Sequence, residues 1–202
     1  MEILLIRHGE SEADILQVHE GRADFELTDR GRKQVKAMAE KVKHDFPPDF
    51  IYASTLKRAS ETARVLADTI GCPLQYEEEL MEHNNGVQAG LSFEEAKSLK
   101  APVYMHDRFD EGESHIEFRM RIETIFSKIL ADSVHKRIAI VAHGGVINCL
   151  LRSFFDMPIS KNFYFKNGDT GISLLEISEK SKVVHFLNNT SHLDTNEELK
   201  SF

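Results

Sequence analysis

Short apolar runs that alternate with amphipathic segments are the feature that most constrains the fold of this sequence. Five such runs have the length and composition of buried or half-buried strands, and they cover residues 3–6, 50–53, 138–142, 172–177 and 183–187. The longer segments between most of them repeat apolar residues at helical spacing. Strands that alternate with helices are typical of an α/β protein, in which helices pack on a largely parallel sheet.

The amphipathic segments carry the start and stop signals of helices. Apolar residues recur at helical spacing in four of them, which cover residues 28–46, 56–70, 118–129 and 146–154. Thr28 is a good N-cap for the first helix, and Gly71 ends the second. The last two strands are close enough in sequence to pair as a hairpin, which is antiparallel. The predicted fold is therefore an α/β three-layer sandwich with a mixed, mostly parallel sheet and helices on both faces.

Length, charge and cysteine content limit the classes of protein that remain. The 202 residues contain no repeat and no linker, so we expect one domain over 1–202, with a polar tail over 194–202 that frays. A formal net charge of −8 argues against nucleic acid or an anionic membrane as partner. Cys72 and Cys149 fit neither a disulfide framework nor a CxxC metal site, and no apolar run approaches the roughly 18 residues of a membrane span. The sequence therefore predicts a soluble cytoplasmic protein.

Two histidines stand where predicted buried strands end, and each is followed by glycine. They are His8, after strand 3–6, and His143, after strand 138–142. In an open α/β sheet, ligands bind beyond the carboxyl ends of the strands. The helix that begins after His143 also presents free N–H groups to an anion. Either histidine alone can be a satisfied surface residue, but the pair predicts an anion site at this edge.

An arginine and a glutamate complete the candidate site. Arg58 opens a helix directly after strand 50–53, so it belongs at the same edge of the sheet. There Arg7 and Arg58 can form a fork around a phosphate, because guanidinium groups bind phosphate with bidentate geometry. Glu82 lies in the irregular region 72–114, and by itself it is a solvated loop charge.

The ordered motifs of the chain resemble those of one known family. They are Arg7-His8-Gly9-Glu10-Ser11, Gly21-Arg22-Ala23-Asp24, Leu56-Lys57-Arg58-Ala59, Glu82 with Gly86 and Gly90, Gly112-Glu113-Ser114, and His143-Gly144-Gly145. In this order they resemble the histidine phosphatase superfamily, in its phosphoglycerate mutase-like branch, over nearly the whole chain.

The resemblance implies a role for each catalytic candidate. His8 is the nucleophile that becomes phosphohistidine, and Glu82 matches the proton donor. The phosphoryl group is held by Arg7, Arg58 and His143. We expect further phosphate contacts from the same motifs, at Ser11, Asp14, Gly21, Arg22 and Gly144.

Asp14 departs from the family, in which this position often carries Asn. An amide donates a hydrogen bond to phosphate, whereas an ionised Asp only accepts, and it repels a phosphate dianion. Three alternatives remain open. Asp14 turns away, or it is protonated, or the pocket prefers a different substrate.

The predicted function is hydrolysis of phosphomonoesters through phosphohistidine on His8, with Glu82 as general acid and then as general base. The alternatives are a cofactor-dependent phosphoglycerate mutase and an inactive phosphate-binding module. Mutases that resemble this chain carry a longer insertion, whereas only about twenty residues separate Gly90 from Gly112, which favours hydrolysis. The expected partner is a small phosphorylated metabolite, and the sequence leaves a homodimer open.

No metal or cofactor is expected. The histidines outside the motifs lack the spacing of a helical zinc site, and the chain has no nucleotide-binding glycine motif. We expect most of them to be solvated: His19, His44, His83, His106, His115, His135, His185 and His192.

Overall fold

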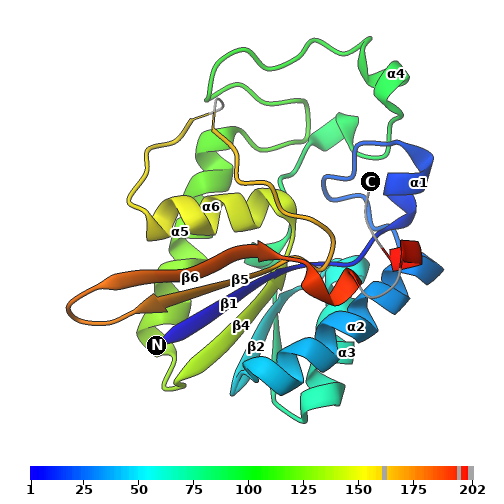
Figure 1. Cartoon of the computed structure of the whole chain (residues 1–202). Coiled ribbons are helices and arrows are strands. Elements are labelled where there is room, and N and C mark those ends of the chain that lie inside the picture. The colour runs from blue at the N-terminus through cyan, green and yellow to red at the C-terminus, as the bar shows by residue number, and fades with distance from the viewer. Residues whose placement is uncertain (161–162, 195–196, 200–202) are drawn as a thin grey trace.

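The computed structural model describes residues 1–160, 163–194 and 197–199, and in this part of the chain six strands form one sheet in the order β3-β2-β4-β1-β5-β6 (Figure 1). The strands are β1 Glu2–Arg7, β2 Phe50–Ser54, β3 Leu74–Glu77, β4 Arg137–Ala142, β5 Ile172–Ile177 and β6 Lys182–Asn189. The first four are parallel to one another, β5 is antiparallel to β1, and β6 is antiparallel to β5. The predicted mixed, mostly parallel sheet is confirmed.

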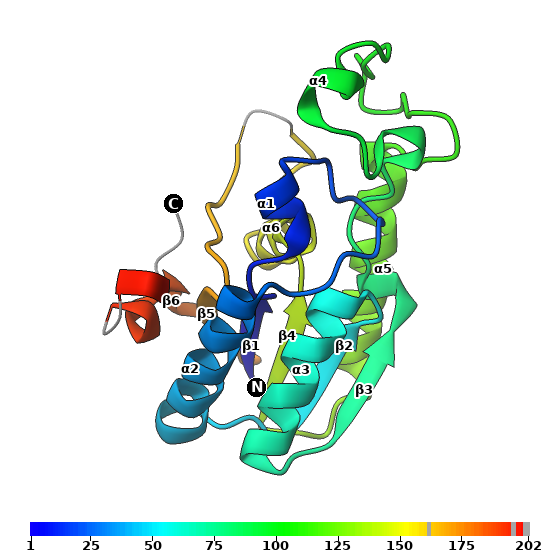
Figure 2. The ribbon, with the colours of Figure 1, turned by 90° about the vertical axis from the view of Figure 1, so that its right-hand side faces the viewer.

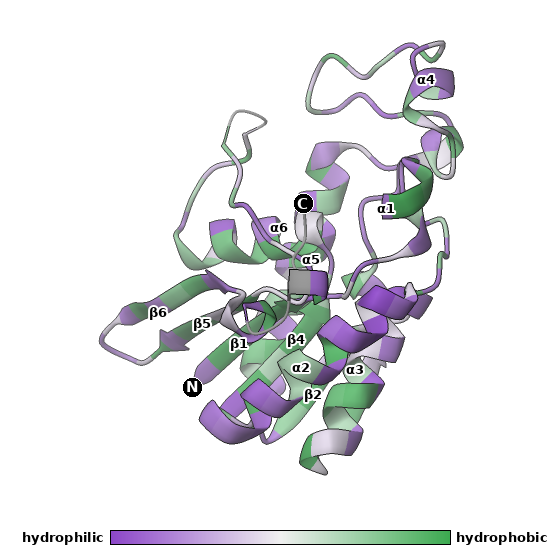
Figure 3. Ribbon diagram, turned by 45° about the vertical axis from the view of Figure 1, so that its right-hand side comes forward, coloured by the Kyte–Doolittle hydropathy of each residue, from purple (hydrophilic) through white to green (hydrophobic). Residues whose placement is uncertain are grey.

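Helices cover both faces of the sheet, as predicted. The helices are α1 Glu12–Leu16, α2 Asp29–Asp45, α3 Lys57–Ile70, α4 Phe93–Ala96, α5 His115–Asp132 and α6 Gly144–Phe154. Figures 1 and 2 show α2 and α3 on one face, and α5 and α6 on the other. Figure 3 shows that the central strands are largely apolar, whereas the outer side of α2 is polar. The three-layer sandwich is confirmed.

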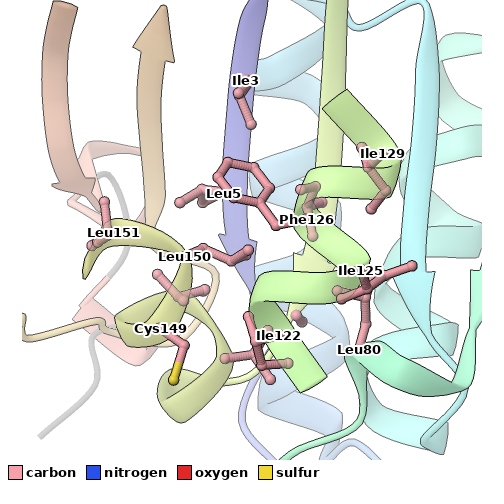
Figure 4. Packing of buried hydrophobic residues seen from close by; sticks show 14 of the residues in the cluster. Ile3, Leu5, Leu80, Ile122, Ile125, Phe126, Ile129, Cys149, Leu150 and Leu151 are labelled. Atoms are coloured by element: carbon pink, nitrogen blue, oxygen red, sulfur yellow. The ribbon is translucent and has the colours of Figure 1, made fainter. Parts of the chain in front are cut away.

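The central strand β1 contributes to both cores because successive side chains point to opposite faces. Ile3 and Leu5 pack with α5 and α6, where Figure 4 shows them beside Phe126 and Leu150. Leu4 and Ile6 pack with α2 and α3 on the other face. These four side chains are fully buried, and the burial of each stabilises the fold by roughly 1.5–3 kcal/mol. The carboxyl end of β1 is thereby fixed between two cores.

Strand β3 was not predicted from the sequence. Its four residues form the outer edge of the sheet beside β2, and Gln75 and Tyr76 are exposed. A short edge strand whose residues are exposed or only half-buried lacks the apolar run that marks an interior strand. The structure therefore adds a strand where the sequence indicated an irregular region.

Within the tail that we expect to fray over 194–202, the structure describes residue 194 and residues 197–199. Glu197–Leu199 forms a 3₁₀ turn against α2, where Gln34 Nε2 donates to the Leu199 carbonyl at 2.9 Å. Residues 195–196 and 200–202 of the expected tail lie outside the described residues. Among the described helices, none is long and apolar enough to cross a membrane.

Candidate active site

The two histidines of the motifs lie side by side at the carboxyl edge of the sheet. Arg7 pairs with Ala142 across β1 and β4, and the His8 N–H continues this ladder by donating to the Ala142 carbonyl at 3.0 Å. The ring centroids of His8 and His143 are 5.1 Å apart, and both side chains are buried. The strand register therefore brings together two residues that are 135 positions apart in the sequence.

The hydrogen bonds of His8 assign its tautomer. His8 Nδ1 lies 2.7 Å from the Gly9 carbonyl, which can only accept, so the proton is assigned to Nδ1. Nε2 then keeps its lone pair, and Arg58 Nε donates toward it at 3.3 Å. Burial holds the pKa of His8 well below its usual value, and the charges of Arg58 and Arg7 lower it further. His8 is therefore a neutral imidazole with a nucleophilic Nε2.

His143 offers a buried donor next to His8. Its Nε2 lies 2.8 Å from Ser54 Oγ, and this hydroxyl also accepts from the Leu56 N–H. When the hydroxyl donates its own hydrogen to Nε2, the imidazole proton is on Nδ1. That atom is buried and has no hydrogen-bond partner within residues 1–160, 163–194 and 197–199. Burial, with Arg58 as the second cause, holds the pKa of His143 well below its usual value.

Arg58 is fixed by backbone carbonyls of a loop that lies over it. The side chain is fully buried, and its terminal nitrogens donate to the carbonyls of Gly21 at 2.9 Å and Ala23 at 3.0 Å. Its Nε–H, which donates toward His8 Nε2, therefore belongs to a side chain whose other end is held by two carbonyls. Arg58 thus has the place beside His8 that the sequence predicted.

Arg7 is tied to the loop that precedes β5. Its NH1 donates to the Asn167 carbonyl at 2.9 Å and lies 3.2 Å from Asp169 Oδ1. Its Nε–H is buried and has no partner among the residues that the structure describes. A half-buried guanidinium whose buried Nε–H is an open donor suits an anion that enters between Arg7 and His8.

Glu82 is held at the start of α6. Its Oε2 accepts from the Gly145 N–H at 2.8 Å, and its Oε1 accepts from the His83 N–H at 2.8 Å. A Cβ at position 145 would lie 2.4 Å from Glu82 Oε1, so this close approach requires glycine. Gly144, the first residue of α6, lies between this contact and His143. The irregular region thus brings a carboxyl group to the helix that follows the second histidine.

Arg22 has a place that differs from the predicted phosphate contact. Its Nε donates to the Glu82 carbonyl at 3.3 Å, and its NH2 lies 3.5 Å from Glu113 Oε1. Arg121 binds the same carbonyl at 3.2 Å and also contacts Glu113. Arg22 therefore supports the loop that carries Glu82.

Asp14 turns toward its own helix. Its Oδ2 accepts from the Ser11 N–H at 2.9 Å, which belongs to a capping box at the start of α1. Its side chain is exposed. This geometry favours the first of the three alternatives for the departure from Asn.

Glu20 is a site residue that the sequence did not reveal. Its carboxylate lies 3.8 Å from His8 Nε2 and 3.5 Å from Arg58 Nε, and it accepts a hydrogen bond from Ser11 Oγ. The only local signal is its position directly before Gly21. An acidic side chain thus faces His8.

A cavity of about 540 Å³ opens beside these residues. Glu20, Gly21, Glu82 and Gly145 line it, and its remaining walls are mixed, with Phe118, Arg119, Asn148 and Tyr164 among them. Its size suits a small organic molecule. Within the described chain, no group of three or more His, Cys, Asp and Glu side chains could hold a metal ion.

Two of the remaining histidines are less solvated than expected. His83 lines the cavity and stacks on His115, with ring centroids 5.0 Å apart. His192 is buried, its Nε2 lies 2.8 Å from Thr170 Oγ1, and burial lowers its pKa to about 4. His192 is therefore an exception to the expectation that most of these histidines are solvated.

A neutral histidine near two arginines at the carboxyl edge of an α/β sheet suits a phosphoryl group. Residues 3–190 match the model of the histidine phosphatase superfamily (branch 1), and the chain belongs to this family.

Known relatives and a solved structure agree with this assignment. An adenosylcobalamin/α-ribazole phosphatase of Salmonella typhimurium is 29% identical over 195 residues, which cover 93% of this chain and 96% of the relative. The phosphoglycerate mutase-like protein 4 of Arabidopsis thaliana is 33% identical over 158 residues, or 74% of this chain and 69% of the relative. The crystal structure of the α-ribazole phosphatase of Shigella flexneri has a TM-score of 0.86 at 26% identity and covers 94% of this chain and 97% of that one. The chain is a phosphatase of this superfamily, as its motifs predicted.

Proposed function

We propose that this protein hydrolyses the phosphomonoester of a small metabolite, with His8 as nucleophile and Glu82 as proton donor and acceptor. The observation that carries the proposal is the neutral Nε2 of His8, whose neighbours are the donors of Arg58, Arg7 and His143. A phosphate monoester is inert in water, so the protein must position it, neutralise its charge and protonate the leaving oxygen. These residues supply each of those functions.

In the first step, the lone pair of His8 Nε2 forms a bond to phosphorus while the bond from phosphorus to the ester oxygen breaks. A protonated Glu82 gives its proton to the leaving oxygen, so a neutral alcohol departs. Arg58, Arg7 and the His143 Nδ1–H donate to the three equatorial oxygens, where charge is spread in the transition state.

In the second step, the ionised Glu82 takes a proton from a water molecule that attacks phosphorus. The bond from phosphorus to Nε2 breaks, the electron pair returns to His8, and inorganic phosphate leaves. Glu82 is then protonated again for the next substrate. The reaction requires neither a metal ion nor a redox cofactor.

The leaving group enters the cavity of about 540 Å³, whose mixed walls accept a small organic alcohol. The similarity to α-ribazole phosphatases makes a phosphorylated ribazole the first compound for a substrate panel. Phosphosugars, phosphoserine and phosphoglycerate are the other candidate substrates for this panel.

Release of p-nitrophenol from p-nitrophenyl phosphate in EDTA tests the proposal. We expect turnover by the native protein, no turnover by His8→Ala, and native turnover by His44→Ala, a control at an exposed histidine. Full activity of His8→Ala would contradict the proposed nucleophile. Transfer of phosphate from a bisphosphate to phosphoglycerate, without hydrolysis, would instead establish the mutase alternative.

We also propose one domain over 1–202 and a homodimer. The single sheet that includes both β1 and β6 supports the first point. For the second, β6 has a strand partner on one side only among the described residues, and Val183, Val184 and Leu187 are exposed on it. Light scattering of the purified chain measures its mass in solution.

The cytoplasmic location remains a prediction, supported by the free thiols of Cys72 and Cys149.

A further inference from the structure

The carboxylate of Glu20 occupies space that a phosphoryl group needs. In a productive complex, the phosphorus atom must stand about 3–3.5 Å from His8 Nε2. Glu20 Oε2 is 3.8 Å from this nitrogen, and Oε1 takes the hydrogen bond of Ser11 Oγ and lies 3.5 Å from Arg58 Nε. Glu20 therefore uses the same donors that would bind the phosphoryl oxygens.

Glu20 also separates the nucleophile from the cavity. It lines the 540 Å³ cavity, whereas His8 and Arg58 are not among the described residues that line it. The side chains of His8 and Arg58 are 1% and 0% exposed, and that of Glu20 is 19% exposed. A substrate that enters the cavity meets the Glu20 carboxylate before it reaches His8.

The backbone holds Glu20 in this place. Gly21 has φ +48°, a left-handed conformation that glycine adopts at little cost, and it turns the chain directly after Glu20. Arg58 binds the carbonyls of Gly21 and Ala23, so the turn is fastened to the same guanidinium that faces His8. The hydrogen bonds of Arg58 to this turn thus hold Glu20 in its position.

We propose that Glu20 is a built-in competitor of phosphate, which occupies the phosphoryl subsite in the free protein and lowers its affinity for inorganic phosphate. The proposal rests on the proposed transfer of phosphate to His8. Like charges at this separation repel, so a phosphate dianion enters only when the Glu20 carboxylate moves aside. The product phosphate leaves more readily for the same reason, because the carboxylate returns to Arg58 and Ser11.

Glutamine at position 20 separates the effect of charge from the effect of shape. Glu20→Gln fills the same space and its side-chain oxygen still accepts from Ser11 Oγ, but it carries no charge and its amide can donate to phosphate. Glu20→Asp keeps the charge and withdraws it from His8 by one methylene group. A matched control is Glu12→Gln, which removes one negative charge at an exposed position near the start of α1.

Calorimetric titration with inorganic phosphate tests the proposal without turnover. We expect Glu20→Gln to lower the Kd for phosphate about tenfold, Glu20→Asp to lower it less, and Glu12→Gln to leave it unchanged. With p-nitrophenyl phosphate, Glu20→Gln should lower KM, while inhibition by phosphate becomes stronger. A merely structural role would weaken phosphate binding in every Glu20 variant.

Several outcomes would overturn the proposal. They are an unchanged or higher Kd for phosphate in Glu20→Gln, an absence of phosphate binding in all variants, or, if Glu20→Gln does not fold, an unchanged or higher Kd in Glu20→Asp. The proposed function fails in a different way. In that case the variants bind phosphate in the expected order, but neither the native protein nor any variant hydrolyses a phosphomonoester.

Discussion

The backbone N–H of Gly145 donates to the carboxylate of Glu82 at 2.8 Å and so joins the candidate proton donor to the helix that His143 begins. Through this contact, the backbone of α6 holds the Glu82 carboxyl group in place.

Gly145→Ala should impair catalysis more than stability. A Cβ at this position would lie 2.4 Å from Glu82 Oε1, so the carboxyl group must move. A displacement of about 1 Å costs roughly 10²-fold in kcat. Thermal unfolding should change little, because Ala is favoured over Gly in a helix by about 1 kcal/mol, which offsets the strain. Ser153→Ala, near the other end of the same helix, is the control, and native kcat in Gly145→Ala would show that the contact is dispensable.

Glu82→Gln should slow hydrolysis most for esters whose leaving oxygen must be protonated. Loss of a general acid typically costs about 10²–10⁴-fold in rate, and we expect this loss with alkyl phosphates. The loss with p-nitrophenyl phosphate should be smaller in the first step, because nitrophenolate leaves without a proton. Rapid-quench kinetics should then show a burst of p-nitrophenol followed by slow turnover. Equal losses with both esters, or a similar loss in the exposed control Glu79→Gln, would contradict the role of Glu82.

Arg58→Lys should lower both activity and stability. Lysine keeps the charge but cannot bind the Gly21 and Ala23 carbonyls while it also donates toward His8. We expect kcat/KM to fall about 10²–10³-fold and the free energy of unfolding to fall by about 1–3 kcal/mol. Urea unfolding and steady-state kinetics measure the two effects. The control is Arg64→Lys, at an exposed position of the same helix, and native kinetics in Arg58→Lys would refute the assigned geometry.

His192→Gln should make stability less sensitive to acid. Burial lowers the pKa of His192 to about 4, so the unfolded chain, with a pKa of about 6.5, binds a proton that the folded chain does not. The contribution of neutral His192 to the free energy of unfolding is fully present above pH 6.5 and is lost as the pH falls. At pH 4.5 this loss amounts to about 2 kcal/mol. Urea unfolding at pH 7 and pH 4.5 should show a smaller loss in His192→Gln than in the native protein. An equal loss in the two proteins would contradict the buried neutral state, and His44→Gln is the exposed control.

The sequence predicted the part of the site that strand ends determine. Buried apolar runs fix the register of β1 and β4, so the residues after Arg7 and Ala142 must be neighbours. His8 and His143 could therefore be placed from local patterns, and Arg58 followed from the strand before it. The sheet was predicted for the same reason, since its interior strands carry continuous apolar runs.

Tertiary contacts determine the part that could not be predicted. Glu20 faces His8 because Arg58 binds the carbonyls that follow it, a contact across more than thirty residues that leaves no local signal. Arg22 belongs to a phosphate-binding motif by sequence, yet its guanidinium reaches the Glu82 carbonyl. Gln75 and Tyr76 of β3 are exposed, so hydrophobicity did not mark that strand.

The place of β1 between β4 and β5 also decides when the protein becomes able to bind phosphate. Glu2 pairs with Arg137 on one side and with Glu176 on the other, so both neighbours of β1 are synthesised long after it. During translation, His8 leaves the ribosome well before the strand that brings His143 to it. Contacts between such distant segments form slowly. A nascent chain therefore contains His8 before β4 and β5 are available to pair with β1. The site for phosphoesters is complete only after these strands have been added to the sheet.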